Sequence, residues 1–199
     1  MAQRISFEFS FLNRARENNA AKRAIARTAA ALIKDGQSVM LDSGTTTLAL
    51  AQHLHGKKGV TVITTSLPIA SELQYDSGIE VLLLGGYMRP GTPDLAGALT
   101  DANLENLRAD LAFTGTDGID DAGIVYNQSP DVARMLTRMA ASAREVYVVA
   151  DNSKLDHSAL FRYGDLKDFA GLITDRKADP AVLKKLKKRG INVIKSRDR

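Results

Sequence analysis

Short apolar segments alternate with segments of helical periodicity along most of this sequence, and this alternation restricts the possible folds more than any other feature. Runs of aliphatic and β-branched residues predict strands, whereas apolar residues spaced three and four positions apart predict helices. The predicted strands are residues 38–42, 60–64, 79–84, 111–114, 145–150, 169–174 and 191–194. The predicted helices between them are residues 45–54, 67–74, 99–107, 129–142 and 179–189. Because strands separated by helices pair in parallel, we expect an α/β fold with a mostly parallel, Rossmann-like sheet and helices on both faces.

Two of these helices carry clear start signals. Ser129 followed by Pro130, and Asp179 followed by Pro180, each place a capping side chain before a proline at the first helical position. Gly190 follows the last helical residue, where a glycine commonly ends a helix. The start of helix 129–142 and both ends of helix 179–189 are therefore predicted from local chemistry.

The first twelve residues have a different pattern from the rest of the chain. Apolar residues alternate there with polar ones, which predicts a strand or extended arm over residues 1–12 that buries its phenylalanines on the body or on a partner subunit. These alternating residues are Ile5, Phe7, Phe9 and Phe11. A helix is predicted over residues 19–34, and Gly36 ends it. We therefore expect residues 1–18 to form an arm or linker remnant and residues 19–199 to form one folded domain, with a small irregular flap over residues 87–98.

Composition excludes several classes of protein. The 199 residues include no cysteine, so disulfides and thiolate chemistry are absent. No apolar run reaches the length of a membrane span and no signal peptide precedes the domain, so we expect a soluble, cytoplasmic protein without membrane contact. The net charge of +4 comes from the two ends of the chain; residues 178–199 hold eight Lys and Arg against two Asp. Such a basic end is either a nucleic-acid surface or a solvated helix face.

The strand at residues 38–42 runs into a small polar loop and then into a helix. Asp42, Ser43, Gly44, Thr45 and Thr46 supply a carboxylate, three hydroxyls and a flexible backbone at that helix start. Unpaired N–H groups and the helix dipole favour an anion at such a position, so the loop is predicted to hold a phosphate. The alternatives are an ordinary capped turn or the Asp-Ser-Gly-Thr of an aspartic protease; we reject the protease because helical patterns dominate the chain.

Polar residues also follow the later strands. Because the carboxyl ends of parallel strands share one edge of a sheet, these loops are expected to form one site for a small polar ligand. The hydroxyl, glycine, cationic and acidic residues concerned are Thr65, Ser66, Gly86, Arg89, Asp117 and Lys154. Each of the three charged residues also has a purely structural explanation when it is taken alone. Arg89 could form a salt bridge within the flap, Lys154 could be a solvated lysine in a turn, and Asp117 could be a turn residue.

The usual nucleotide and hydrolase motifs are missing from the sequence. It has no G-x-G-x-x-G, no P-loop, no G-x-S-x-G and no H-E-x-x-H. His53 and His55 would point to different sides of their helix, so a shared metal site is not expected. We predict no metal and no cofactor.

The polar loops, in this order and spacing, resemble the C-terminal effector-sensing domain of the DeoR family of bacterial transcription regulators. The matching residues are 22–26, 41–47, 64–68, 84–86 with Arg89, 115–120 with Gly123, and 150–154. This resemblance implies a sheet similar to that of ribose-5-phosphate isomerase and a phosphorylated sugar that switches an attached DNA-binding domain. The family's N-terminal winged helix-turn-helix does not precede Ile5, and residues 125–129 differ from the family's usual stretch.

An isomerase is the alternative from another class. Ribose-5-phosphate isomerase is similar to this sequence at the Ser-Gly-Thr loop, at residues 117–120 and at residues 151–154. Aldose–ketose isomerisation needs a carboxylate base, which that family supplies as a glutamate after a glycine-rich run. Residues 123–132 contain no glutamate. Their one carboxylate, Asp131, is predicted to be a first-turn helix residue. We therefore expect binding without turnover. A sugar-phosphate deaminase is a third and weaker alternative, because this sequence lacks the base that it would need too.

The resemblance and the loop chemistry together predict the effector-binding domain of a repressor of carbohydrate catabolism. The phosphate or acidic end is assigned to Ser43, Gly44, Thr45, Thr46 and Lys154. The sugar portion is assigned to Asp42, Thr65, Ser66, Gly86, Arg89 and Asp117. The expected partners are a phosphorylated sugar or sugar acid, operator DNA through the missing N-terminal domain, and further copies of the chain in a dimer or tetramer.

Overall fold

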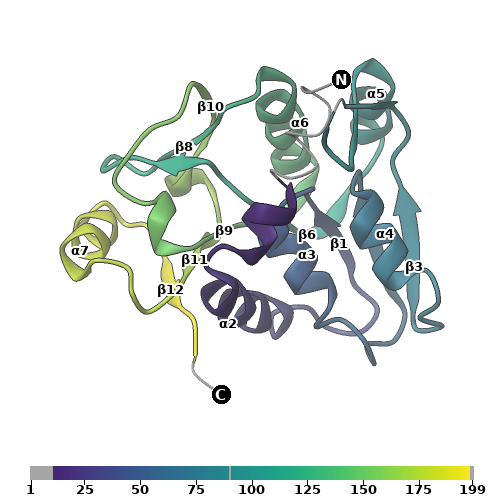
Figure 1. Cartoon of the computed structure of the whole chain (residues 1–199), viewed down its shortest axis with the longest axis horizontal. Helices are drawn as coiled ribbons and strands as arrows, with labels where there is room; N and C mark the ends of the chain where they lie inside the picture. Colours follow the sequence, from purple (N-terminus) through teal and green to yellow (C-terminus); the bar gives the residue numbers. More distant parts are fainter. Residues whose placement is uncertain (1–10, 90, 198–199) are drawn as a thin grey trace.

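A seven-stranded parallel sheet forms the centre of the molecule in the computed structural model, which describes residues 11–89 and 91–197 (Figure 1). All six neighbouring strand pairs in this sheet are parallel. Across the sheet the strands are β12 (Val193–Lys195), β11 (Gly171–Thr174), β9 (Ala143–Ala150), β6 (Ala109–Thr114), β1 (Ser38–Leu41), β2 (Val60–Thr64) and β3 (Ile79–Leu83). The seven predicted strands are confirmed, with ends that shift by up to two residues.

The order of the strands changes direction between β1 and β6. From β1 the chain moves outward to β2 and β3, whereas from β6 it moves the other way to β9, β11 and β12. Right-handed crossovers in opposite directions place their helices on opposite faces of the sheet. Such a reversal also opens a crevice beyond the carboxyl ends of the two central strands.

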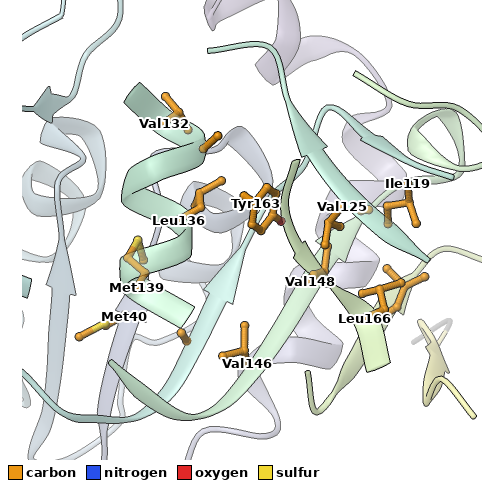
Figure 2. Packing of buried hydrophobic residues seen from close by; sticks show 14 of the residues in the cluster. Met40, Ile119, Val125, Val132, Leu136, Met139, Val146, Val148, Tyr163 and Leu166 are labelled. Atoms are coloured by element: carbon orange, nitrogen blue, oxygen red, sulfur yellow. The ribbon is translucent and has the colours of Figure 1, made fainter. Parts of the chain in front are cut away.

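Helices cover both faces, as predicted. One face carries α2 (Asn19–Ala30), α3 (Thr45–Ala51) and α4 (Leu67–Leu73), and the other carries α5 (Ala98–Glu105), α6 (Pro130–Ala141) and α7 (Pro180–Lys188). The first group buries Ile25, Leu50 and Ile69 in one apolar cluster. Figure 2 shows the second cluster, in which Val132, Leu136 and Met139 of α6 lie near Val146 and Val148 of β9.

The predicted helix signals act as expected. The Ser129 hydroxyl accepts a hydrogen bond from the Val132 N–H at 3.5 Å, and Pro130 opens α6. The Asp179 carboxylate accepts from the Ala181 N–H at 2.7 Å, and α7 begins at the following proline. Gly190 adopts a φ of 84° after α7, a conformation that side-chain-bearing residues rarely adopt.

Two smaller sheets were not predicted. The strands β7 (Gly118–Ile119), β8 (Ile124–Asn127) and β10 (Phe161–Asp165) form an antiparallel sheet beside α6. The predicted flap over residues 87–98 contains a hairpin of β4 (Tyr87–Met88) and β5 (Leu95–Ala96). Strands this short carry little periodicity, and β8 finds its partner β10 only after more than thirty intervening residues, so the local sequence gives no signal for them.

The predicted N-terminal arm lies mostly outside the described residues. Residues 11–16 are helical, so the extended conformation predicted for Phe11 and Leu12 is wrong. Phe11 is buried while Leu12 is exposed, a pattern set by packing against the body of the domain. The boundary proposed between residues 18 and 19 stays a prediction. Within the described parts of the chain, no helix combines the length and apolar character needed to cross a membrane.

Candidate functional site

A cleft of about 330 Å³ lies at the carboxyl ends of β1, β6 and β9, where the strand order reverses. The loops after these three strands line it, as expected for a ligand site in an open α/β sheet. Eight of the eleven predicted site residues line the cleft, and these are Asp42, Ser43, Gly44, Thr45, Thr46, Arg89, Asp117 and Lys154. The structure therefore brings most of the predicted residues to one place.

Asp42 forms the base of the cleft and joins its two central loops. Its carboxylate accepts hydrogen bonds from the Gly44 N–H at 2.9 Å, from the Thr47 hydroxyl at 2.6 Å and from the Gly115 N–H at 2.6 Å. Burial raises the pKa of Asp42, and the three hydrogen bonds oppose that rise by stabilising the ionised form. Because this carboxylate already accepts three hydrogen bonds from the protein, its role is to hold the two central loops of the cleft together.

The loop after β1 leads into the first turn of α3. The first intrahelical hydrogen bond runs from the Leu48 N–H to the Gly44 carbonyl at 3.0 Å. The N–H groups of Thr45 and Thr46 therefore have no intrahelical acceptor, and both residues line the cleft. Hydroxyls and N–H groups at a helix start suit an anionic group, so the geometry at this loop agrees with the predicted phosphate position.

The flap supplies an ion pair at the side of the cleft. The Arg89 guanidinium donates from Nε to Asp94 Oδ1 at 2.8 Å and from Nη2 to Oδ2 at 2.5 Å. The same buried carboxylate accepts from the Thr92 hydroxyl at 2.9 Å and from the Ser43 hydroxyl. The flap salt bridge considered for Arg89 is thus present, and through Ser43 it ties the flap to the loop after β1.

A group of cations also lines the cleft. Lys154 lines the cleft beside Arg14 and Lys22, two residues that the sequence reasoning did not assign to the site. Burial lowers the pKa of Lys22 below its usual value. Two carboxylates, Asp151 and Glu17, oppose this shift, while the two neighbouring cations reinforce it. This wall of the cleft is therefore rich in positive charge.

Asp117 positions a loop over the cleft. Its carboxylate accepts a hydrogen bond from the Gln128 N–H at 3.0 Å, and its carbonyl accepts from Nε2 of His157 at 3.0 Å. Asn127, Gln128 and Ser129 line the cleft as a result. These three residues belong to the stretch 125–129 that departs from the resemblance, whereas Val125 of the same stretch is buried in the core.

Three predicted site residues do not line the cleft. The Thr65 carbonyl accepts a hydrogen bond from the Leu95 N–H of the flap at 3.1 Å, and the Ser66 hydroxyl caps α4 by accepting from the Ile69 N–H at 3.3 Å. A side chain at Gly86 would place its Cβ 2.8 Å from the Ala96 carbonyl oxygen, so the backbone needs glycine for this close approach. These residues hold the flap in place, and their contact with an effector stays a prediction.

Sequence reasoning missed the contribution of residues 11–18 and of Lys22 in α2. Phe11, Arg14, Glu17, Asn18 and Lys22 all line the cleft. Lys22 belongs to one of the motifs that carry the family resemblance, which is the one cue that pointed toward it. The others come to the cleft only because residues 11–18 fold back over the carboxyl end of the sheet.

Two solved structures illustrate the similarity of the fold. Ribose-5-phosphate isomerase A from Methanocaldococcus jannaschii superposes with a TM-score of 0.52 at 20% identity, over 70% of this chain and 55% of that one. The eIF2B delta subunit from Chaetomium thermophilum gives a TM-score of 0.56 at 20% identity, over 82% of this chain and 57% of that one. The chain thus spans little more than half of either protein, and the likeness confirms the predicted fold class alone.

Closer relatives are regulators of transcription. The HTH-type transcriptional repressor GlcR of Bacillus subtilis (strain 168) is 34% identical over 185 residues, which cover 93% of this chain and 71% of GlcR. The HTH-type transcriptional regulator GolR of Listeria innocua is 33% identical over 190 residues, covering 92% of this chain and 72% of GolR. The family model described as the DeoR C terminal sensor domain matches residues 17–176. The chain therefore belongs to the DeoR family of transcriptional regulators, as a C-terminal sensor domain.

Proposed function

We propose that this domain binds a phosphorylated sugar or sugar acid in the cleft between the loops of β1, β6 and β9. The observation that carries the proposal is the composition of that cleft, with a hydroxyl-rich helix start on one side and the cations Arg89 and Lys154 among the other lining residues. A volume of about 330 Å³ lies at the lower end of the range for small-molecule sites and suits a ligand of this size.

The anionic end of the ligand is assigned to the start of α3. Thr45 and Thr46 offer hydroxyl and N–H donors there, Ser43 and Gly44 form the loop that leads into them, and Lys154 supplies a positive charge. Arg89 and Asp117 are assigned to the sugar portion, since both line the cleft and both carry groups that bind hydroxyls. Asp42 supports this arrangement by holding the two central loops together.

Binding without turnover is the second part of the proposal. An isomerase needs a carboxylate placed to move a proton between adjacent carbons of the substrate. The carboxylates of Asp42 and Asp94 are buried and accept several hydrogen bonds, and Asp117 holds the Gln128 backbone. Asp131, the one carboxylate in residues 123–132, pairs with Arg134 at 3.2 Å in the first turn of α6. None of these groups is arranged as a base, which favours a sensor over an isomerase.

The regulatory consequence follows from the family. The curated relatives carry names of HTH-type repressors and regulators, so we infer that ligand binding here controls a winged helix-turn-helix elsewhere in a longer protein. Such a protein represses genes of carbohydrate catabolism, acts in the cytoplasm and assembles as a dimer or tetramer on palindromic operator DNA. The ligand acts by binding one conformation of the sensor more tightly than the other.

A thermal-shift panel of phosphorylated sugars and sugar acids tests the binding site. A ligand present at 100 times its Kd stabilises the folded protein by about 2.7 kcal/mol, which is a clear rise in Tm. Thr46→Ala and Lys154→Ala should each abolish that rise. Lys184→Ala, at an exposed position of α7 outside the cleft, is the matched control and should keep it. Full binding by both cleft variants would place the ligand elsewhere.

An NMR assay separates the sensor from the isomerase. Each sugar phosphate that raises Tm is incubated with the protein, and the aldose and ketose signals are followed over hours. The proposal expects the starting sugar to persist at the rate seen without protein. Sustained conversion that Lys154→Ala removes would assign the cleft to catalysis.

A further inference from the structure

The segment before α2 forms one wall of the cleft. Phe11, Arg14, Glu17 and Asn18 line the cleft although they precede the first central strand by twenty residues or more. Figure 1 shows this short purple helix beside α3, near the middle of the molecule. A ligand in the cleft is therefore within reach of the part of the chain that leads toward the N-terminus.

Side-chain hydrogen bonds between residues of the cleft help to hold this wall. The Lys22 ammonium donates to the Glu17 carbonyl at 2.7 Å and to the Arg14 carbonyl. The Asn18 side chain donates to Asp151 Oδ1 at 3.1 Å. Asn18 has a φ of 51°, a left-handed conformation that turns the chain sharply between residues 11–16 and α2. The position of the wall thus depends on the loop that carries Lys154.

The charges on this wall are only partly balanced, since the carboxylates of Asp151 and Glu17 attract the Lys22 ammonium while Arg14 and Lys154 repel it. Within residues 11–89 and 91–197, the side chains of Arg14 and Lys154 make no salt bridge, although both lie close enough to Lys22 to interact with it. Three cations that approach one another repel, and a bound anion between them removes that repulsion. The loop after β1, across the cleft, is the position assigned above to the anionic end of the ligand.

We propose that Arg14 contacts the anionic group of the effector together with Lys154, so that an occupied cleft holds residues 11–18 against the sensor domain. This inference rests on the proposed function and adds the route by which ligand binding is transmitted. The effector binds more tightly when the segment is docked, so it shifts the population toward the docked state. The conformational change therefore begins in the segment that contacts the ligand and needs no path through the core.

The experiment combines binding and hydrogen exchange on the same protein. Inorganic phosphate and ribose 5-phosphate are the probes; Kd comes from a thermal-shift titration, and exchange is followed at the amides of residues 11–18. Both probes should slow exchange in this segment. Arg14→Ala should weaken binding by about tenfold or more, as expected for one charge-assisted hydrogen bond, and should remove the added protection. Arg14→Lys should recover part of both effects, because it keeps the charge.

Arg16→Ala is the matched control, since Arg16 is exposed on the same short helix and does not line the cleft. It should bind both probes as the wild type does. The inference is overturned if Arg14→Ala binds the probes as tightly as the wild type and shows the same ligand-induced protection in residues 11–18. That result would leave the proposed ligand site intact. If neither probe binds to the wild type, the proposed anion site is wrong, and this inference is wrong with it.

Discussion

The carboxylate of Asp42 joins β1 to the loop after β6 through the Gly115 N–H, which donates to Oδ2 at 2.6 Å. These two residues follow the neighbouring strands at which the strand order reverses. The other oxygen accepts from Gly44 and Thr47, so one buried side chain connects both central walls of the cleft. The effector site therefore depends on a residue whose own hydrogen bonds are directed into the protein.

Replacing Asp42 by Ala should cost about 3–5 kcal/mol of unfolding free energy, because three buried donors lose their acceptor. Urea denaturation measures the change, and the effector-induced rise in Tm should vanish along with it. Asp121→Ala, at an exposed turn position, is the control and should stay within about 0.5 kcal/mol of the wild type. A loss below 1 kcal/mol for Asp42→Ala would mean that water replaces the carboxylate and that the two walls do not depend on it.

Tyr163→Phe tests the support beneath Gly115. The Tyr163 hydroxyl donates to the Gly115 carbonyl at 2.7 Å and lies 3.3 Å from the Thr114 hydroxyl, in a fully buried position. Burial raises the pKa of this phenol well above its usual range, so it remains a donor at all working pH values. Its removal should cost about 1–2 kcal/mol by urea denaturation. Tyr75→Phe, on an exposed side chain, should be neutral, and an equal effect of the two would contradict this role.

A double-mutant cycle on Arg89 and Asp94 measures the ion pair of the flap. Arg89→Ala should cost about 2–3 kcal/mol of unfolding free energy, because the Asp94 carboxylate then stays buried with hydroxyl donors alone. The double variant should be less destabilised than the sum of the two single variants, by about 1–3 kcal/mol. Simple additivity would show that the pair contributes nothing to the position of the flap.

His55 makes part of the stability dependent on pH. Hydrogen bonds to Glu72 and Asp76 raise the pKa of His55 above the ordinary histidine value of 6.5. A raised folded-state pKa stabilises the protein fully below the unfolded-state pKa, and this stabilisation is lost as pH rises through the folded-state pKa. The wild type should therefore exceed His55→Gln in stability at pH 5.5, with a smaller difference at pH 9. The effect should stay below about 1 kcal/mol because the side chain is exposed.

His53 should give a pH dependence of stability opposite to that of His55, which the variant His53→Gln tests. Burial lowers the pKa of His53, and the nearby Arg27 and Arg23 lower it further. Any stability that neutral His53 provides is therefore present at high pH and lost as pH falls below the unfolded-state pKa. Urea midpoints at several pH values and low salt should separate the two histidines. Parallel pH profiles for both variants would contradict the assigned directions.

Local signals in the sequence account for the order and type of the main elements. The capping residues Ser129 and Asp179 begin their helices because a hydroxyl or carboxylate oxygen can accept from a free N–H two or three residues on. The seven central strands follow from short apolar runs, since a strand buried on both faces needs an apolar side chain at nearly every position. The polar loops after them were predictable as one site because parallel strands share their carboxyl edge.

Only the tertiary structure decided which of those polar residues face the cleft. Thr65 and Ser66 follow a strand as the site residues do, yet they hold the flap and α4, because the return of the chain at residues 93–95 covers them. Arg14 enters the cleft from residues 11–18, a segment with no local signal of such a role. Sequence determines the local backbone through neighbouring residues, whereas a binding surface forms between segments far apart in the chain, and their approach depends on the packing of the whole domain.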